Sequence, residues 1–297
     1  IPKGYAISMP SFESLSVHKD QVDANPPIPL ETDWKAIYRY FDNWVDEAEG
    51  LKNEERTKYY RQMMRHFVLI SYNSGTRPAE LLGRLDKRRV PHPEGGWTIQ
   101  ETIIGGLRWA DVEVEPKTHH TSTGKSFEFL EAMLYIRESK TGVPREMPTN
   151  TGKYFLRWRQ FCDQFRKENG LPKLYPKDYV FFNPFTGRPY PYSQVSSSWD
   201  QMRVNLSLIL NPSKSGNLYT LYSLRSSYIT NQINEGKDVY LIKKLTGHSL
   251  EVLNKHYDRS EVRRRRDEAT SRTYGASKSK SNKIDLNKAD KYKKHTA

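Results

Sequence analysis

The sequence carries five polar side chains whose chemistry suits the transfer of a phosphodiester. Two arginines can each bind phosphate oxygens in a fork and stay charged at any working pH. A lysine can protonate a departing oxygen, a histidine can accept or donate a proton, and a tyrosine hydroxyl can attack phosphorus to give a covalent intermediate. These residues are Arg77, Lys140, Arg225, His248 and Tyr257. Such a set needs neither a metal nor a nucleotide cofactor.

Most of these residues fall where an expected helix begins or a strand turns. Arg77 lies in GTRPAELLG, where Pro78 suits the first turn of a helix. Lys140 lies in SKTG, between the expected strand LYIRE and the segment VPREMP, which predicts the tip of a β-hairpin. Arg225 lies in the first turn of the expected helix SLRSSYITNQ. Cations and free N–H groups at such places can converge on one anion.

The segment LTGHSLEVLNKHYDRS, residues 245–260, predicts a corner between two helices. Gly247 suits the C-terminal cap of the first helix, because glycine tolerates the left-handed conformation. His248 then lies on the corner, and Tyr257 lies two turns down the second helix. Taken alone, the segment is equally typical of a packed corner with a core aromatic. His256 has no assigned role.

Hydrophobic periodicity predicts an α+β fold that is mainly helical and carries a small antiparallel β-sheet or hairpin. The first helix is expected from Thr32-Asp33. Strands are expected at 107–115 and 127–139, separated by a polar loop at 116–125. Further helices are expected at residues 59–75, 75–83, 151–170, 193–210, 223–236, 238–247 and 249–257.

Four segments of the chain resemble the tyrosine recombinases, or phage-type integrases. GTRPAELLG resembles the family's first arginine box, LYIRESKTGV resembles its lysine hairpin, LYSLRSSYIT resembles its second arginine box, and LTGHSLEVLNKHY resembles its closing segment. The spacings of 23 residues from Arg225 to His248 and nine from His248 to Tyr257 are close to the family's. The resemblance implies that Tyr257 is the nucleophile and that Arg77, Lys140, Arg225 and His248 assist it.

The chain departs from the family pattern in three ways. The family usually has a histidine three residues before the second arginine, where this chain has Tyr222. Tyr222 either donates a hydrogen bond to the phosphate or is a core aromatic. An insertion at residues 84–106, containing LDKRR, separates the first box from the strand at 107–115; it is expected to be a solvated loop or a contact to DNA or a neighbouring subunit. No core-binding domain precedes residue 32 in this sequence.

Composition favours a nucleic-acid partner. The 297 residues include 48 Lys and Arg against 35 Asp and Glu, a net charge of +13. Of this, +8 lies in residues 259–297. Cys162 is the only cysteine, so no internal disulfide forms, which fits a reducing cytoplasm. No Cys or His stands at ligand spacing from His119-His120, so no metal site is expected.

The resemblance implies three regions. These are an N-terminal arm or linker at 1–31, a catalytic domain at 32–260, and a basic C-terminal tail at 261–297 that either docks on a neighbouring subunit or adds non-specific DNA affinity. The tail's arginine run at 263–266 would grip a DNA backbone or an acidic groove. No apolar run is long enough to predict a membrane span.

The function implied is site-specific DNA recombination through a 3′-phosphotyrosyl intermediate. The expected partners are a double-stranded DNA site, a homotetramer on two such sites and accessory DNA-bending proteins, with no cofactor. The expected location is the cytoplasm, with the nucleoid, of a bacterium or phage host. Two alternatives stay open: a type IB topoisomerase or telomere resolvase with the same chemistry, and a DNA-binding module that has lost catalysis.

Overall fold

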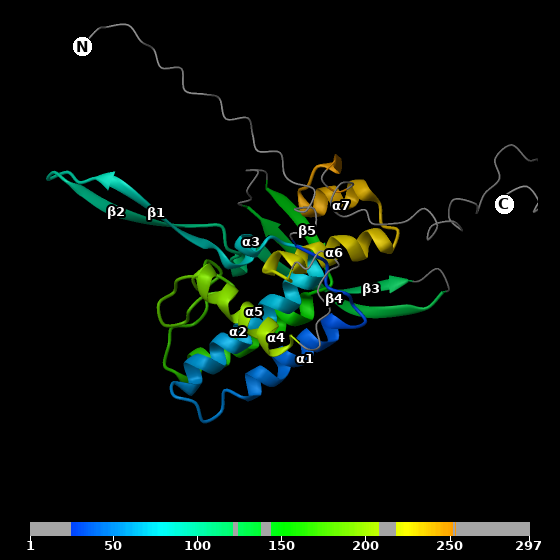
Figure 1. The fold of residues 1–297 in the computed structure, drawn as a ribbon, viewed down its shortest axis with the longest axis horizontal. Coiled ribbons are helices and arrows are strands. Elements are labelled where there is room, and N and C mark those ends of the chain that lie inside the picture. The colour runs from blue at the N-terminus through cyan, green and yellow to red at the C-terminus, as the bar shows by residue number, and fades with distance from the viewer. Residues whose placement is uncertain (1–24, 121–123, 138–143, 208–217, 252, 254–297) are drawn as a thin grey trace, which may run out of the picture. The chain divides into compact units, whose positions relative to one another are not determined.

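The computed structural model describes residues 25–120, 124–137, 144–207, 218–251 and 253. The chain divides into two units, residues 1–259 and 260–297, and every described residue lies in the first. This first unit is α+β and mainly helical, as predicted (Figure 1). Its helices are α1 (Asp33–Asp46), α2 (Glu54–Ser74), α3 (Pro78–Leu82), α4 (Gly152–Glu168), α5 (Tyr192–Asn205), α6 (Leu221–Asn234) and α7 (Val239–Thr246). Its strands are β1 (Arg84–Pro91), β2 (Trp97–Ile104), β3 (Val112–His120), β4 (Ser126–Ile136) and β5 (Arg145–Thr149).

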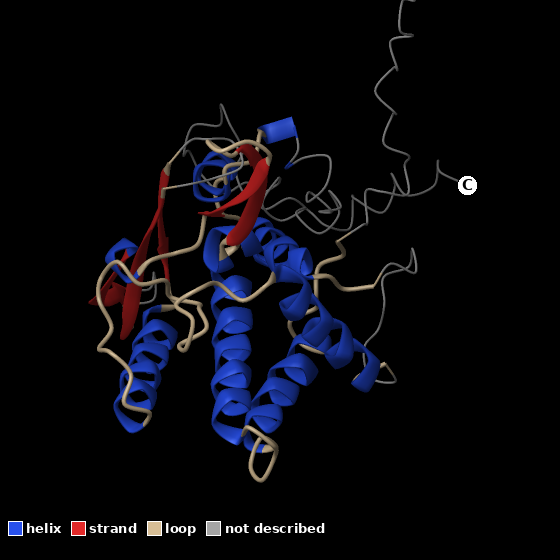
Figure 2. Ribbon diagram, turned by 90° about the vertical axis from the view of Figure 1, so that its left-hand side faces the viewer, coloured by secondary structure: helices blue, strands red, loops and turns tan. Residues whose placement is uncertain are grey.

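The long helix α2 runs through the core. It packs against α1, α4, α6 and β5. Figure 2 shows the helices in blue and the strands in red. Almost every side chain from Met63 to Ile70 is buried, so this helix is covered on all sides rather than along one stripe. It ends at Gly75, whose φ of 65° is left-handed; a Cβ there would lie 2.2 Å from the ring of Tyr228 in α6. Only glycine therefore lets α2 end so close to α6.

Three antiparallel strands form the main sheet, in the order β3-β4-β5. The hairpin partner predicted in VPREMP is present, because β5 pairs with β4. The polar loop predicted at 116–125 is wrong for its first half: β3 continues to His120. Pro116 lies within β3, and β3 is an edge strand, where a proline is tolerated. The start of the expected strand at 107–115 is instead a 3₁₀ turn at Trp109–Asp111.

The insertion at 84–106 is not a loop. Strands β1 and β2 pair along their whole length, from Arg84 with Ile104 to Pro91 with Trp97, and form a separate two-stranded ribbon. Figure 1 shows this ribbon extending away from the helices. One of its faces carries the apolar side chains Leu85, Trp97, Ile99 and Ile103, whose alternation with polar residues is a strand pattern.

The last residues of the predicted arm pack on the core. Ile28 is only 1% exposed, and its backbone N–H donates to the Ser227 hydroxyl of α6 at 2.8 Å. The Tyr72 hydroxyl of α2 donates to the Ile28 carbonyl at 3.3 Å. Residues 25–28 thus lie against α6, the helix that carries Arg225. Among the described residues, no helix combines the length and apolar character needed to cross a bilayer.

Candidate active site

Three of the six predicted site residues lie together in the described structure. Arg77 stands at the N-terminal end of α3, Arg225 is in α6, and His248 directly follows the C-terminal cap of α7. Arg225 contacts His248 across 23 positions, and Arg77 approaches the Gly247 carbonyl, at 3.5 Å, across 170 positions. Lys140 and Tyr257 lie outside the described residues.

Arg225 is buried and held by backbone carbonyls. Its side chain is 2% exposed; Nη1 donates to the Gly75 carbonyl at 2.7 Å and Nη2 to the Thr246 carbonyl at 2.5 Å. These carbonyls lie at the C-terminal ends of α2 and α7, where carbonyl groups have no hydrogen-bond donor within their own helix. Helix ends therefore fix the guanidinium in place before any ligand arrives.

His248 lies beside this guanidinium. Its Nδ1 and Nε2 atoms are 3.2 Å and 3.4 Å from Arg225 Nη2, and Nδ1 is also 3.2 Å from the Thr246 hydroxyl. Because that hydroxyl already donates its proton to the Ile242 carbonyl, at 2.7 Å, it can only accept from His248. The network thus favours the tautomer with the proton on Nδ1, which leaves the Nε2 lone pair as an acceptor.

Burial, followed by the positive charges of Arg225, Arg77 and Arg145, lowers the pKa of His248 to about 3. The carboxylate of Glu80 acts in the opposite direction but is outweighed. The imidazole is therefore neutral at physiological pH and, in this environment, a weak base.

A carboxylate that sequence analysis missed connects Arg77 to the rest of the site. Glu80 is 5% exposed, and its two oxygens accept four N–H bonds, two from Arg77 and two from Arg145. Burial alone would raise the pKa of Glu80, but these hydrogen bonds and the charge of Arg145 outweigh burial and lower it. The spacing of Arg77 and Glu80 was a usable signal, because a glutamate three residues after a helix N-cap suits a capping box.

Arg145 is the second residue that sequence analysis missed. It lies at the start of β5, where its side chain is 9% exposed. The signal was its register: Arg145 shares one face of the strand with Met147 and Thr149, both buried. An arginine on the buried face of a strand requires a partner, and Glu80 is that partner.

Tyr222 is 40% exposed in the first turn of α6, three residues before the buried Arg225. This exposure rules out the alternative that Tyr222 is a core aromatic. Tyr222 lies near Tyr192, at the start of α5. The pKa of Tyr192 is raised mainly by burial and then by the nearby Tyr222. The Tyr222 side chain thus lies at the surface, on the helix that carries Arg225.

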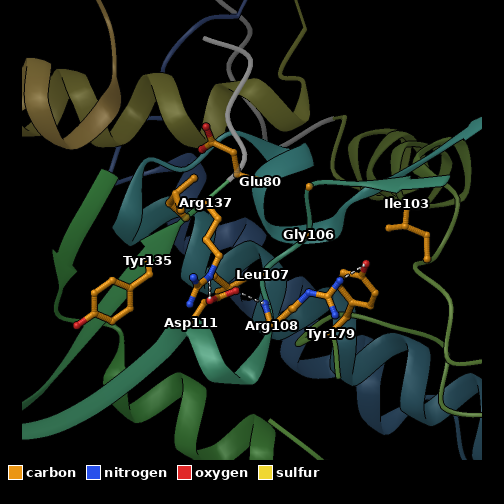
Figure 3. A pocket seen from close by; sticks show the side chains of 11 residues that line it. Glu80, Ile103, Gly106, Leu107, Arg108, Asp111, Tyr135, Arg137 and Tyr179 are labelled. Carbon is orange, nitrogen blue, oxygen red and sulfur yellow. Dashed lines mark hydrogen bonds and ion pairs between the residues drawn. The ribbon is translucent and has the colours of Figure 1, made fainter. Parts of the chain in front are cut away.

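A cavity of about 60 Å³ adjoins the cluster and shares Glu80 with it (Figure 3). Four of its other polar side chains are already engaged in two pairs. Arg137 donates to Asp111, and Arg108 donates to the Tyr179 hydroxyl at 3.0 Å while stacking on that ring. The cavity is too small for a nucleotide, and the anion-binding groups of the site lie outside it.

The arrangement as a whole suits an anion rather than a metal ion. Arg77, Arg145, Arg225 and a neutral imidazole meet around the ends of α2, α3 and α7, with a single carboxylate that is already saturated. Within the described ranges, no three His, Cys, Asp or Glu side chains are grouped as metal ligands. Guanidinium groups fixed by protein carbonyls are preorganised for an oxyanion.

The sequence matches no protein-family model, and no curated protein matches it significantly. Solved structures do match. XerH site-specific recombinase bound to difH substrate matches with a TM-score of 0.50 and 14% identity, over 82% of this chain and 53% of that one. Tn1549 transposon integrase in complex with transposon right end DNA matches with a TM-score of 0.46 and 16% identity, over 82% and 65%. XerA recombinase gives a TM-score of 0.42 at 13% identity, over 75% and 65%.

The chain thus spans about half the length of XerH, the neighbour on which the fold assignment rests. The predicted fold class is confirmed, with helices around a small antiparallel sheet. The described part of this chain has the fold of the tyrosine recombinase catalytic domain.

Proposed function

We propose that this chain cuts and rejoins DNA as a site-specific recombinase, with Tyr257 as the nucleophile. One observation carries the proposal: Arg77, Arg225 and His248 come from three motifs far apart in the sequence and meet at one place. The two arginines are oriented by backbone carbonyl oxygens and by Glu80. A fold assignment alone would not require this convergence.

In the proposed reaction, the two non-bridging oxygens of a DNA phosphate accept hydrogen bonds from Arg77 and Arg225. The Tyr257 oxygen attacks phosphorus, its proton passes to the neutral His248, and the bond from phosphorus to the 5′ oxygen breaks. Lys140 protonates this leaving oxygen, which gives a free 5′-hydroxyl and a 3′-phosphotyrosyl bond. A 5′-hydroxyl of a second strand then reverses these steps and reseals the backbone.

The electrostatics of the site support this assignment of roles. Negative charge grows on the phosphate oxygens as the fifth bond to phosphorus forms, and the buried Arg225 faces that charge in a medium of low dielectric constant. The same positive charges that lower the pKa of His248 are offset when a phosphate binds. Binding therefore makes the imidazole a better base when the proton of Tyr257 must be removed.

DNA is the proposed partner, with a homotetramer on two sites, accessory DNA-bending proteins and the cytoplasm of a bacterium or phage host as the setting. The net charge of +13 suits a polyanion. XerH was solved bound to difH substrate, and the Tn1549 integrase in complex with transposon right end DNA. The tail at 261–297 is proposed to dock on the neighbouring subunit, and this region lies outside the described residues.

The test is covalent trapping on DNA. The full-length protein is incubated, in EDTA, with a nicked suicide duplex built from direct repeats that flank the gene. An adduct that resists SDS and forms without a metal supports the proposal. Rejoining only to a partner duplex with the same site separates a recombinase from a topoisomerase. A protein that binds the duplex but forms no adduct would be a DNA-binding module, and the proposal would be wrong.

A further inference from the structure

The carboxylate of Glu80 has one oxygen shared between two guanidinium groups. Arg145 donates from Nη1 to Oε1 at 3.0 Å and from Nη2 to Oε2 at 2.6 Å, which is a two-pronged pair. Arg77 donates from Nη1 to Oε1 at 2.8 Å and from its backbone N–H to Oε2 at 2.8 Å. Each oxygen therefore accepts two hydrogen bonds, which is its full capacity.

Arg145 also contacts the segment that carries His248. Its Nε donates to the Leu245 carbonyl in the last turn of α7, at 2.8 Å. One side chain on β5 thus connects α3, which begins next to Arg77, to the end of α7, which leads into His248. The side-chain exposures of Arg145 and Glu80 are 9% and 3%, so water competes little for these bonds.

Arg145 occupies the carboxylate of Glu80 and thereby limits how the guanidinium of Arg77 can bind to that carboxylate. A free carboxylate prefers to bind a guanidinium through both of its oxygens. With Arg145 in place, the guanidinium of Arg77 contacts Glu80 through Nη1 alone, and its Nη2 is directed toward the Gly247 carbonyl, 3.5 Å away. Without Arg145, Glu80 can take both prongs of Arg77 and turn the guanidinium away from the place where Arg225 and His248 meet.

We propose that Arg145 is a positioning residue for the strand-transfer reaction: it occupies Glu80 and holds the end of α7, so that Arg77 and His248 face the same phosphate. This inference rests on the proposed function of the site. Arg145 itself does not touch the phosphate.

The charges around His248 support this role. Arg225 faces it from α6, Arg77 and Glu80 from the start of α3, and Arg145 from β5. After burial, the three arginines lower the pKa of the imidazole, and Glu80 raises it. Removal of Arg145 therefore subtracts a positive charge and leaves Glu80 less neutralised, and both changes raise the pKa of His248.

A double-mutant cycle tests the proposal in the full-length protein. The variants are Arg145→Met, Glu80→Gln and the two combined. Arg145→Lys is the variant that keeps the charge but not the planar arrangement of three donor nitrogens. Three quantities are measured: the single-turnover rate of adduct formation on the nicked duplex, the Kd for that duplex, and the thermal unfolding temperature. We expect Arg145→Met to slow adduct formation about 10²-fold at saturating DNA, because a small misplacement of a catalytic group costs about that much.

The double variant separates positioning from folding. Arg145→Met alone should lower the unfolding temperature, because the buried carboxylate of Glu80 loses two of its hydrogen-bond donors. The added Glu80→Gln change removes the charge of that carboxylate, so the double variant should regain part of the lost unfolding temperature. The rate stays low in the double variant, because Arg77 and the end of α7 are still not held. Arg145→Lys should fall between wild type and Arg145→Met. In Arg145→Met, NMR should show the His248 ring titrating at a higher pH than in the wild type.

The matched control is Arg65 with Asp42, an arginine–carboxylate pair that connects α2 to α1 away from the site. Arg65→Met and Asp42→Asn should change the unfolding temperature but not the rate for folded protein. The inference is overturned if Arg145→Met forms adduct at the wild-type rate, or if the double variant regains the rate together with the unfolding temperature. It is also overturned if the pKa of His248 is unchanged. A wild-type protein that forms no adduct overturns the proposed function instead, and the NMR result then still reports on Arg145.

Discussion

Arg225 Nη2 lies 3.2 Å from Nδ1 and 3.4 Å from Nε2 of His248, 23 positions further along the chain. The same Nη2 donates to the Thr246 carbonyl, and Nη1 donates to the Gly75 carbonyl. A permanent positive charge is thus placed against an imidazole that cannot easily become charged. Burial first, and then this positive charge, lower the pKa of His248 and keep the imidazole neutral.

Tyr257→Phe should bind the nicked duplex as tightly as the wild type and form no SDS-resistant adduct. Only the attacking oxygen is removed, so the surface that binds DNA is unchanged. Gel analysis of adduct and a binding titration, both in EDTA, measure the two quantities. An adduct that persists in this variant, or that forms only with Mg²⁺, would show that another residue is the nucleophile.

Arg225→Lys should lose about 10²–10³-fold in the rate of adduct formation, the usual cost of one preorganised donor. Lysine keeps the charge but cannot donate to two carbonyls and to a phosphate in one plane. The variant should also unfold at a lower temperature, because the Gly75 and Thr246 carbonyls lose a buried partner. Arg77→Lys, at a less buried position, should lose a similar factor in rate with a smaller change in unfolding temperature. Wild-type rates in both would contradict the assignment.

Tyr222→Phe should slow adduct formation without changing the unfolding temperature. The ring is 40% exposed, so removing its hydroxyl costs little folding energy. If the hydroxyl donates to the phosphate, Tyr222→His should retain activity, because an imidazole can donate from the same helix position. Cleavage by Tyr222→Phe at the wild-type rate would remove Tyr222 from the site.

The sequence predicted Arg77, Arg225 and His248 as parts of one site because their chemistry suits one phosphate and because their motifs resemble the boxes of the tyrosine recombinases. Glycine at 75 and 247 ends a helix by its own backbone preference, and so marks both carbonyl-bearing ends that surround Arg225. The α+β class followed from periodicity in the same local way.

The partners of these residues depended on long-range pairing. Arg145 is buried only because β5 pairs with β4 in a register that puts Arg145 and Met147 on one face. Its contacts with Glu80 and Leu245 cross 65 and 100 positions, and no local pattern encodes them. The ribbon at 84–104 was wrongly predicted as a loop although its signal is local. Its apolar residues alternate with polar ones as in a strand, but its charged residues suggested a loop.

Deleting the ribbon should weaken DNA binding and reduce its dependence on salt. Gly83 and Gly105 lie side by side at its base, so residues 84–104 can be replaced by one glycine with little effect on the unfolding temperature. Lys87 and Arg88 already pair with Glu101 and Asp86, which leaves Arg84 and Arg89 as the expected phosphate contacts. The slope of log K against log salt should therefore fall by about two, at about 0.9 per phosphate. An unchanged slope with intact recombination would show that the ribbon does not touch DNA.

As the pH is lowered, this fold should begin to lose stability at a higher pH than carboxylate titration alone would cause, because two histidines are held neutral in the folded state. Burial, the largest effect, lowers the pKa of His66 to about 4, and burial with three arginines lowers that of His248 to about 3. In the unfolded chain both return to ~6.5. Between pH 6.5 and 4 the unfolded state therefore binds protons that the folded state does not. Stability is complete above pH 6.5 and falls as the pH is lowered, by at most about 1.4 kcal/mol per pH unit for each histidine.

Thermal unfolding followed from pH 7 to pH 4.5 measures this loss. His66→Phe keeps a ring against Trp158, 5.4 Å away in the wild type, and removes one titrating group, so the decline in unfolding temperature with acid should be about half as steep. His120→Gln, on the exposed end of β3, is the matched control and should leave the decline unchanged. Adding the nicked duplex should flatten the decline further, because a phosphate beside His248 offsets the arginines that keep its pKa low. A decline that is equally steep in His66→Phe would mean that other groups cause the acid sensitivity.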